Sequence, residues 1–210
     1  RQLGTAAEYI ALPAETAVRL PDSVSFAEGA CLGIPAMTAH RCLLADGPVD
    51  GFWVLVTGGA GAVGNYGIQL AKWAGANVIS TVSSEAKAEA AKRAGADHVL
   101  NYKSEDIAER VLEITDGKGV DRIVEVDLGE NFPVSAQVIK GNGSIGTYAS
   151  SRVPEPVFPH YKLMPRNVNV RLVFVYEMPD EAKRSACADI TRAFEEGGLG
   201  HPVGPSFSLD

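Results

Sequence analysis

The 210-residue sequence contains few cysteines and histidines, and they do not cluster. The three cysteines are Cys31, Cys42 and Cys187, and the four histidines are His40, His98, His160 and His201. No two cysteines form a C-x-x-C pair, and neither residue type has the spacing of a zinc site, which needs at least three protein ligands. We therefore predict no bound metal, and buried, reduced thiols in a cytoplasmic protein rather than a disulfide framework.

Clusters of basic residues and long apolar runs are also missing. The chain has 19 Lys and Arg against 26 Asp and Glu, a net charge of −7, with no basic block. This balance argues against nucleic acid as a main partner and against a polybasic membrane site. No apolar run is long enough to span a bilayer, and no secretory signal pattern opens the sequence. We expect a protein that binds neither nucleic acid nor membrane.

Several motifs of nucleotide-dependent and hydrolytic enzymes are absent as well. The sequence contains neither G-x-x-x-x-G-K-[ST] nor H-E-x-x-H, so P-loop and zincin sites are not indicated. None of its six tyrosines is followed by lysine four positions later, so the Tyr-x-x-x-Lys pair of short-chain dehydrogenases is missing.

The most informative feature that is present is a glycine-rich turn. Residues 54–64 read Val-Leu-Val-Thr-Gly-Gly-Ala-Gly-Ala-Val-Gly, an apolar run that leads into a helical pattern. Gly59, Gly61 and Gly64 have the G-x-G-x-x-G spacing, in which glycines allow a sharp turn, close approach to phosphates and tight helix packing. We predict that the pyrophosphate of a dinucleotide is bound by Gly59, Ala60, Gly61, Ala62, Val63 and Gly64. An ordinary tight turn between a strand and a helix is the alternative.

Strand and helix patterns alternate along the chain. We predict short strands over residues 7–12 and 17–20, and helices over 25–31, with a capping box at Ser25 and Glu28, and 35–44. Further strands are predicted over 52–57, 78–82, 98–100, 121–126, 144–148 and 167–176. Further helices are predicted over 62–74, 104–115, 132–139 and 180–196, with a loop over 153–165. This order predicts an α/β Rossmann fold, a doubly wound sheet of six parallel strands with helices on both faces.

The end of the second strand of this fold favours one cofactor over another. An Asp or Glu about 20 residues after the glycines binds the 2′-hydroxyl of NAD, and residues 80–84 contain no acid. Ser83 and Ser84 offer hydroxyls and Lys87 a positive charge for a 2′-phosphate, which favours NADPH over NADH. Glu85 lies close by and opposes this choice, and Lys87 equally fits an ordinary solvent-exposed lysine.

An ordered set of short segments resembles one enzyme superfamily. Segments 4–9, 12–14, 20–22, 25–26, 35–39, 54–64, 95–97, 101–102 and 119–121 follow each other as in the medium-chain dehydrogenase/reductases. They resemble the zinc-independent quinone oxidoreductase branch, which includes zeta-crystallin. The resemblance implies a piece of a longer protein. Residues 1–33 are then a remnant of a GroES-like catalytic domain, 34–199 the NADP-binding domain, and 200–210 the start of the return to the catalytic domain.

The resemblance also implies site residues and partners. The 2′-phosphate would be flanked by Lys87 and Tyr102, the nicotinamide would lie near Thr38, and the rest of the cofactor would be lined by Asp127, Tyr148, Phe174 and Val175. Tyr102 is also compatible with a surface aromatic and Phe174 with a core residue. The strand over 167–176 implies a homodimer.

The implied reaction is hydride transfer from NADPH to a quinone or enone. Ile34 stands where alcohol dehydrogenases place a cysteine ligand of zinc, although Cys31 is close. Two alternatives stay open: a zinc-type alcohol dehydrogenase whose ligands lie outside this sequence, and a non-catalytic NADPH-binding module.

Overall fold

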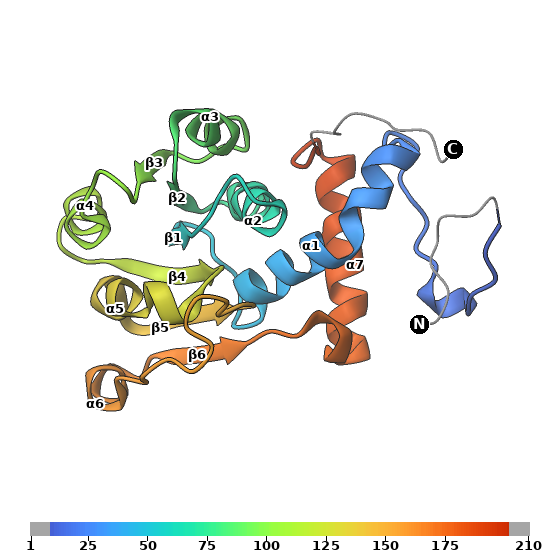
Figure 1. The fold of residues 1–210 in the computed structure, drawn as a ribbon. Coiled ribbons are helices and arrows are strands. Elements are labelled where there is room, and N and C mark those ends of the chain that lie inside the picture. Colours follow the sequence, from blue (N-terminus) through green and yellow to red (C-terminus); the bar gives the residue numbers. More distant parts are fainter. Residues whose placement is uncertain (1–8, 202–210) are drawn as a thin grey trace.

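Six parallel strands form one sheet at the centre of the fold (Figure 1). The computed structural model describes residues 9–201 of the chain. The strands are β1 (Trp53–Val56), β2 (Asn77–Val82), β3 (His98–Asn101), β4 (Val120–Glu125), β5 (Ile139–Thr147) and β6 (Asn169–Leu172). Their order in the sheet is β3-β2-β1-β4-β5-β6, which confirms the predicted doubly wound arrangement.

Helices cover both faces of the sheet, as Figure 1 shows. The helices are α1 (Phe26–Leu44), α2 (Ala62–Trp73), α3 (Glu85–Arg93), α4 (Ile107–Ile114), α5 (Leu128–Val138), α6 (His160–Leu163) and α7 (Asp180–Glu195). Successive residues of a strand point to opposite faces. Thus Val54 and Val56 pack with α1, α2, α3 and α7, while Leu55 packs with α4, α5 and α6. Within residues 9–201, no helix has the length and apolar character needed to cross a membrane.

The segment before α1 does not form the predicted strands. Residues 9–13 and 17–20 are irregular, and a 3₁₀ turn, η1 (Ala14–Thr16), lies between them. Their side chains favour a strand, but a strand needs a partner strand or a packed face to be stable. Here Ile10 and Val18 remain half exposed, at 50% and 54%. Residues 7 and 8 of the first predicted strand lie outside the described part of the chain.

One continuous helix, α1, replaces the two predicted ones. It begins as predicted, with Ser25 and Glu28 exchanging hydrogen bonds in a capping box, but Pro35 lies inside it rather than starting a new helix. A proline in a helix interior costs about 3 kcal/mol. Burial of the following turns, including Ala36, Ala39 and Leu43, offsets this cost.

Other differences concern the ends of elements. The helix predicted over 132–139 begins four residues earlier, at Leu128, and α6 lies within the predicted loop over 153–165. The strand predicted over 167–176 stops at Leu172, where pairing with β5 ends, and is followed by a 3₁₀ turn, η3 (Val175–Glu177). A further 3₁₀ turn, η2 (Met164–Arg166), precedes β6. Of the three cysteines only Cys42 is fully buried, and burial raises the pKa of its thiol to about 12.

Candidate cofactor site

The glycine-rich turn joins the carboxyl end of β1 to the start of α2. Gly58 has a φ of +67°, a conformation that favours glycine, and its carbonyl accepts a 2.9 Å bond from the Gly61 N–H. A Cβ on Gly64 would lie 2.4 Å from that same carbonyl oxygen. Position 64 therefore allows α2 to pack on the turn, as predicted. The residue with the special φ, however, is Gly58, one position before the predicted motif. Two adjacent glycines in the sequence were the available signal.

Unpaired backbone donors lie at the first turn of α2. Gly61 is the N-cap and has no side chain to cap the helix, and the first helical bond runs from the Asn65 N–H to its carbonyl. The N–H groups of Ala62, Val63 and Gly64 lack intrahelical acceptors by geometry. Ala62 is exposed. These N–H groups at a helix N-terminus favour an anion such as pyrophosphate.

Four predicted residues lie together beyond the ends of β2 and β3. The Lys87 ammonium donates a 2.9 Å hydrogen bond to the Ser83 hydroxyl, and Ser84 is the N-cap of α3 with no side-chain cap bond. The Tyr102 N–H bonds the Val82 carbonyl at 3.1 Å, which holds this tyrosine beside the same strand end, and its side chain is 43% exposed. The hydroxyls and the ammonium are therefore close to each other and accessible.

Thr81, which the sequence analysis missed, ties the glycine turn to this region. Its hydroxyl accepts a 3.2 Å bond from the Gly58 N–H, and its carbonyl accepts a 3.1 Å bond from the Gly59 N–H. The two bonds hold the turn beside the end of β2. A threonine inside an apolar strand gives no local signal of this role.

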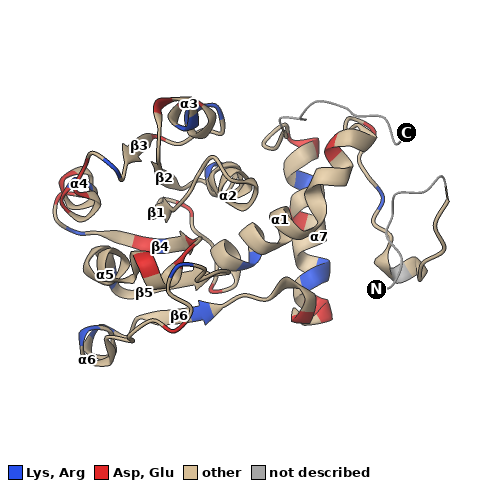
Figure 2. Ribbon diagram, in the orientation of Figure 1, with Lys and Arg blue, Asp and Glu red and all other residues tan. Residues whose placement is uncertain are grey.

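A cavity of about 600 Å³ opens between the ends of β1, β2 and β4 and helices α4 and α5. Tyr102 and Asp127, two of the predicted cofactor-binding residues, line it, and so do residues that were not predicted from the sequence, among them Thr57, Asn131 and Arg152. Figure 2 shows acidic residues along this wall, on α4 and around the end of β4. Arg152 balances part of this charge, 3.8 Å from the Asp127 carboxylate and 3.6 Å from Glu130.

A second cavity, of about 260 Å³, lies at the ends of β5 and β6. Tyr148 and Phe174 line it together with Thr147 and Leu172. Burial raises the pKa of the Tyr148 phenol above its ordinary value, so this group keeps its proton at neutral pH. The larger cavity spans the point where the strand order reverses, between β1 and β4, and the smaller one lies on the β5 and β6 side of it. Ligands of doubly wound sheets bind at this point.

Of the predicted residues, only Tyr102, Asp127, Tyr148 and Phe174 line these cavities, and Thr38 and Val175 do not. Thr38 is buried in α1, at 4% exposure, and Val175 packs against the core on the α1 side. Their proposed contacts with the cofactor remain predictions.

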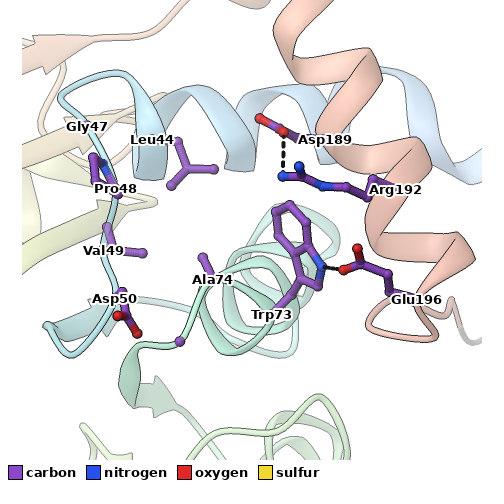
Figure 3. A pocket seen from close by; sticks show the side chains of 11 residues that line it. Leu44, Gly47, Pro48, Val49, Asp50, Trp73, Ala74, Asp189, Arg192 and Glu196 are labelled. Carbon is purple, nitrogen blue, oxygen red and sulfur yellow. Dashed lines mark hydrogen bonds and ion pairs between the residues drawn. The ribbon is translucent and has the colours of Figure 1, made fainter.

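A cavity of about 620 Å³ lies at the opposite, amino edge of the sheet (Figure 3). The indole N–H of Trp73 donates to Glu196 at 2.6 Å, and Arg192 stacks 4.8 Å over the indole ring while it pairs with Asp189 at 3.1 Å. These polar groups satisfy one another, as the dashed lines in Figure 3 indicate. The cavity lies remote from the glycine turn, at the other end of α2.

The histidines and cysteines lie apart from one another. Buried His40 on α1 bonds Asp189 on α7 at 2.9 Å, and exposed His98 lies near Trp53. Within residues 9–201, no three side chains of His, Cys, Asp or Glu come together in a way that could hold a metal ion.

Comparison with known proteins identifies the family. Residues 62–191, more than half of the chain, match a family model described as "Zinc-binding dehydrogenase". The chain belongs to this family. The predicted resemblance to the medium-chain dehydrogenase/reductases is thereby confirmed.

Individual relatives cover most of this chain, although the chain covers only part of each of them. The quinone oxidoreductase of Sus scrofa is 27% identical over 208 residues, which is 99% of this chain and 63% of that protein. The 2-haloacrylate reductase of a Burkholderia species is 33% identical over 159 residues, 74% of this chain and 48% of that protein. The structure of Escherichia coli quinone oxidoreductase complexed with NADPH has a TM-score of 0.79 and 26% identity. The superposed region covers 91% of this chain and 60% of that chain. NADP is thus a cofactor of this family.

Proposed function

We propose that this chain is the NADPH-binding part of an oxidoreductase that transfers hydride to a quinone or another conjugated carbonyl. The observation that carries the proposal is the end of β2, where the Lys87 ammonium and the Ser83 hydroxyl lie 2.9 Å apart and no acid occupies residues 80–84. A carboxylate there would repel a 2′-phosphate, whereas these groups donate to it. Residues 34–199 form the cofactor domain of this proposal, with the flanking residues belonging to a catalytic domain.

The described residues offer groups for each part of a dinucleotide. The free N–H groups at the start of α2 would hold the pyrophosphate, and the close approach of Gly64 to Gly58 packs this helix start against the glycine turn. The larger cavity, beside Tyr102 and Asp127, would take the adenosine half. The smaller cavity, beside Tyr148 and Phe174, would take the nicotinamide end. When bound, NADPH supplies the hydride, and the protein orients it.

The proposed substrate class rests on the relatives. A quinone oxidoreductase and a 2-haloacrylate reductase are among the proteins similar to this chain. Conjugated acceptors take a hydride without a Lewis acid, which agrees with Ile34 at the position of a zinc-ligating cysteine. The family description, "Zinc-binding dehydrogenase", favours a second candidate, a zinc-type alcohol dehydrogenase whose ligands come from outside this chain.

We expect full-length protein to oxidise NADPH in the presence of quinones and enones, with turnover unchanged after treatment with a zinc chelator. The measurement is the fall in NADPH absorbance across a panel of acceptors, with zinc content determined on the same preparation. Stoichiometric zinc whose removal stops turnover would favour the alcohol dehydrogenase. Tight NADPH binding without oxidation of any acceptor would instead favour a non-catalytic module.

We also propose that two copies of the chain pair through β6. This strand is the edge of the sheet in the described residues, and Leu172 is 78% exposed on it. An exposed apolar edge strand favours pairing with a second copy. We expect Leu172→Lys to convert a dimer into a monomer in analytical ultracentrifugation. Val157→Lys changes another highly exposed apolar side chain, at 90% exposure and outside the strand, and is expected to leave the dimer intact. A wild-type monomer at all concentrations would contradict the proposal.

A further inference from the structure

A buried carboxylate lies beneath the point where the strand order reverses. Glu125 is the last residue of β4, which pairs with β1, and its side chain is 0% exposed. It therefore cannot touch a cofactor bound in either cavity. The sequence analysis treated it only as part of an apolar strand, because a single acid at a strand end has no local signature.

Four donors converge on this carboxylate. The Thr57 hydroxyl, the Asp127 N–H and the Asn131 amide donate to its Oε1 at 3.0, 2.8 and 2.7 Å. The Ser135 hydroxyl donates to its Oε2 at 3.2 Å. Burial raises the pKa of Glu125, and these hydrogen bonds act in the opposite direction. No Lys or Arg of the described residues pairs with it, so its contacts are hydrogen bonds to neutral donors.

These bonds connect two turns that face each other across the crevice. Thr57 directly precedes the glycine turn, and its hydroxyl also accepts a 2.9 Å bond from the Val126 N–H. Thr57 and Glu125 therefore accept hydrogen bonds from two consecutive N–H groups of the turn between β4 and α5. Thr57 accepts from Val126, and Glu125 accepts from Asp127. The pair therefore links this turn to the end of β1, from which the glycine turn begins.

We propose that Thr57 and Glu125 are positioning residues that set the width of the crevice between the two turns, so that one dinucleotide can reach both cavities. Glu125 holds the turn through its acceptor oxygen Oε1 and not through its charge. The inference rests on the proposed NADPH site. It adds Glu125, which is fully buried and cannot contact the cofactor, and Thr57, which lines the larger cavity and holds the turn after β4.

The test compares a ligand that spans the crevice with one that occupies a single side. NADPH crosses from one half of the site to the other, whereas adenosine 2′,5′-bisphosphate carries only the adenosine half. Thr57→Val leaves the Val126 N–H without its acceptor. Loss of such a buried hydrogen bond is expected to weaken the affinity for NADPH by about tenfold. Binding of the bisphosphate is expected to change by less than about twofold, because valine keeps the shape of Thr57 in the wall of the larger cavity and the proposed 2′-phosphate contacts of Ser83 and Lys87 lie at the end of β2. Both dissociation constants are measured by titration calorimetry on the full chain.

Three further variants separate positioning from general loss of stability. Thr115→Val removes another buried hydroxyl, which accepts from the Gly119 N–H at 2.9 Å near the amino end of β4, and is expected to leave both ligands unaffected. Thr57→Ser keeps the hydroxyl and is expected to restore NADPH binding. Glu125→Gln keeps an acceptor oxygen for the three donors and is expected to bind NADPH within about threefold of wild type.

The outcomes are distinguishable. Selective loss of NADPH binding in Thr57→Val, with rescue in Thr57→Ser, supports the positioning role. Equal loss of both ligands, no loss of either, or a Glu125→Gln variant as weak as Thr57→Val overturns it. A wild-type chain that binds neither ligand overturns the proposed NADPH site itself.

Discussion

Replacing Gly64 with alanine is expected to weaken NADPH binding by about tenfold to a hundredfold, since overpacking a tight contact costs about 1–3 kcal/mol. The new Cβ would lie 2.4 Å from the Gly58 carbonyl oxygen and 2.9 Å from the Gly59 Cα. All of these are backbone atoms, so no side chain can rotate away. Either α2 or the turn has to move, and both carry the N–H groups proposed to bind pyrophosphate.

The same helix offers a matched control for this prediction. A Cβ on Gly67 would lie 3.4 Å from Val56 and 3.5 Å from Val124, which are ordinary contact distances. Gly67→Ala is therefore expected to keep wild-type affinity and to gain up to about 1 kcal/mol of helix propensity. Dissociation constants from fluorescence titration and Tm values for both variants provide the test. Wild-type NADPH affinity in Gly64→Ala would show that the turn does not bind the pyrophosphate.

Replacing Lys87 with alanine is expected to weaken the affinity for NADPH by about tenfold and to leave the affinity for NADH unchanged, because a charge-assisted hydrogen bond to the 2′-phosphate is lost. The lysine is exposed and lies beside Ser83 at the end of β2. The contribution of Lys87 to NADPH affinity is accordingly expected to decrease as salt is added. The experiment titrates each nucleotide separately at low and high ionic strength.

Lys92 supplies the control for the charge that Lys87→Ala removes. It lies on the same helix and pairs with Glu89 at 2.9 Å, away from the end of β2. Lys92→Ala is expected to bind both nucleotides as the wild type does. Equal affinity of the wild type for NADPH and NADH would contradict the assignment of Ser83 and Lys87 to a 2′-phosphate.

Sequence patterns were reliable where the determining contacts are local. The Ser25–Glu28 capping box joins residues three positions apart, and the structure contains it. The alternation of strands and helices predicted a six-stranded parallel sheet, which the strand order confirms. The patterns failed for the segment before α1 and for the two helices predicted around Pro35. There, the outcome depends on whether a partner strand exists and on how much surface the helix buries.

Periodicity and glycine spacing in the sequence were sufficient to predict the Rossmann fold, the glycine-rich turn between β1 and α2 and the acid-free end of β2, because each is a property of neighbouring residues. The positions of Thr57, Thr81 and Glu125 under the turn were decided only in the folded chain. The Gly58–Thr81 and Thr57–Glu125 hydrogen bonds join residues 23 and 68 positions apart. Such contacts form when the sheet brings distant strand ends together, and no short stretch of sequence encodes them.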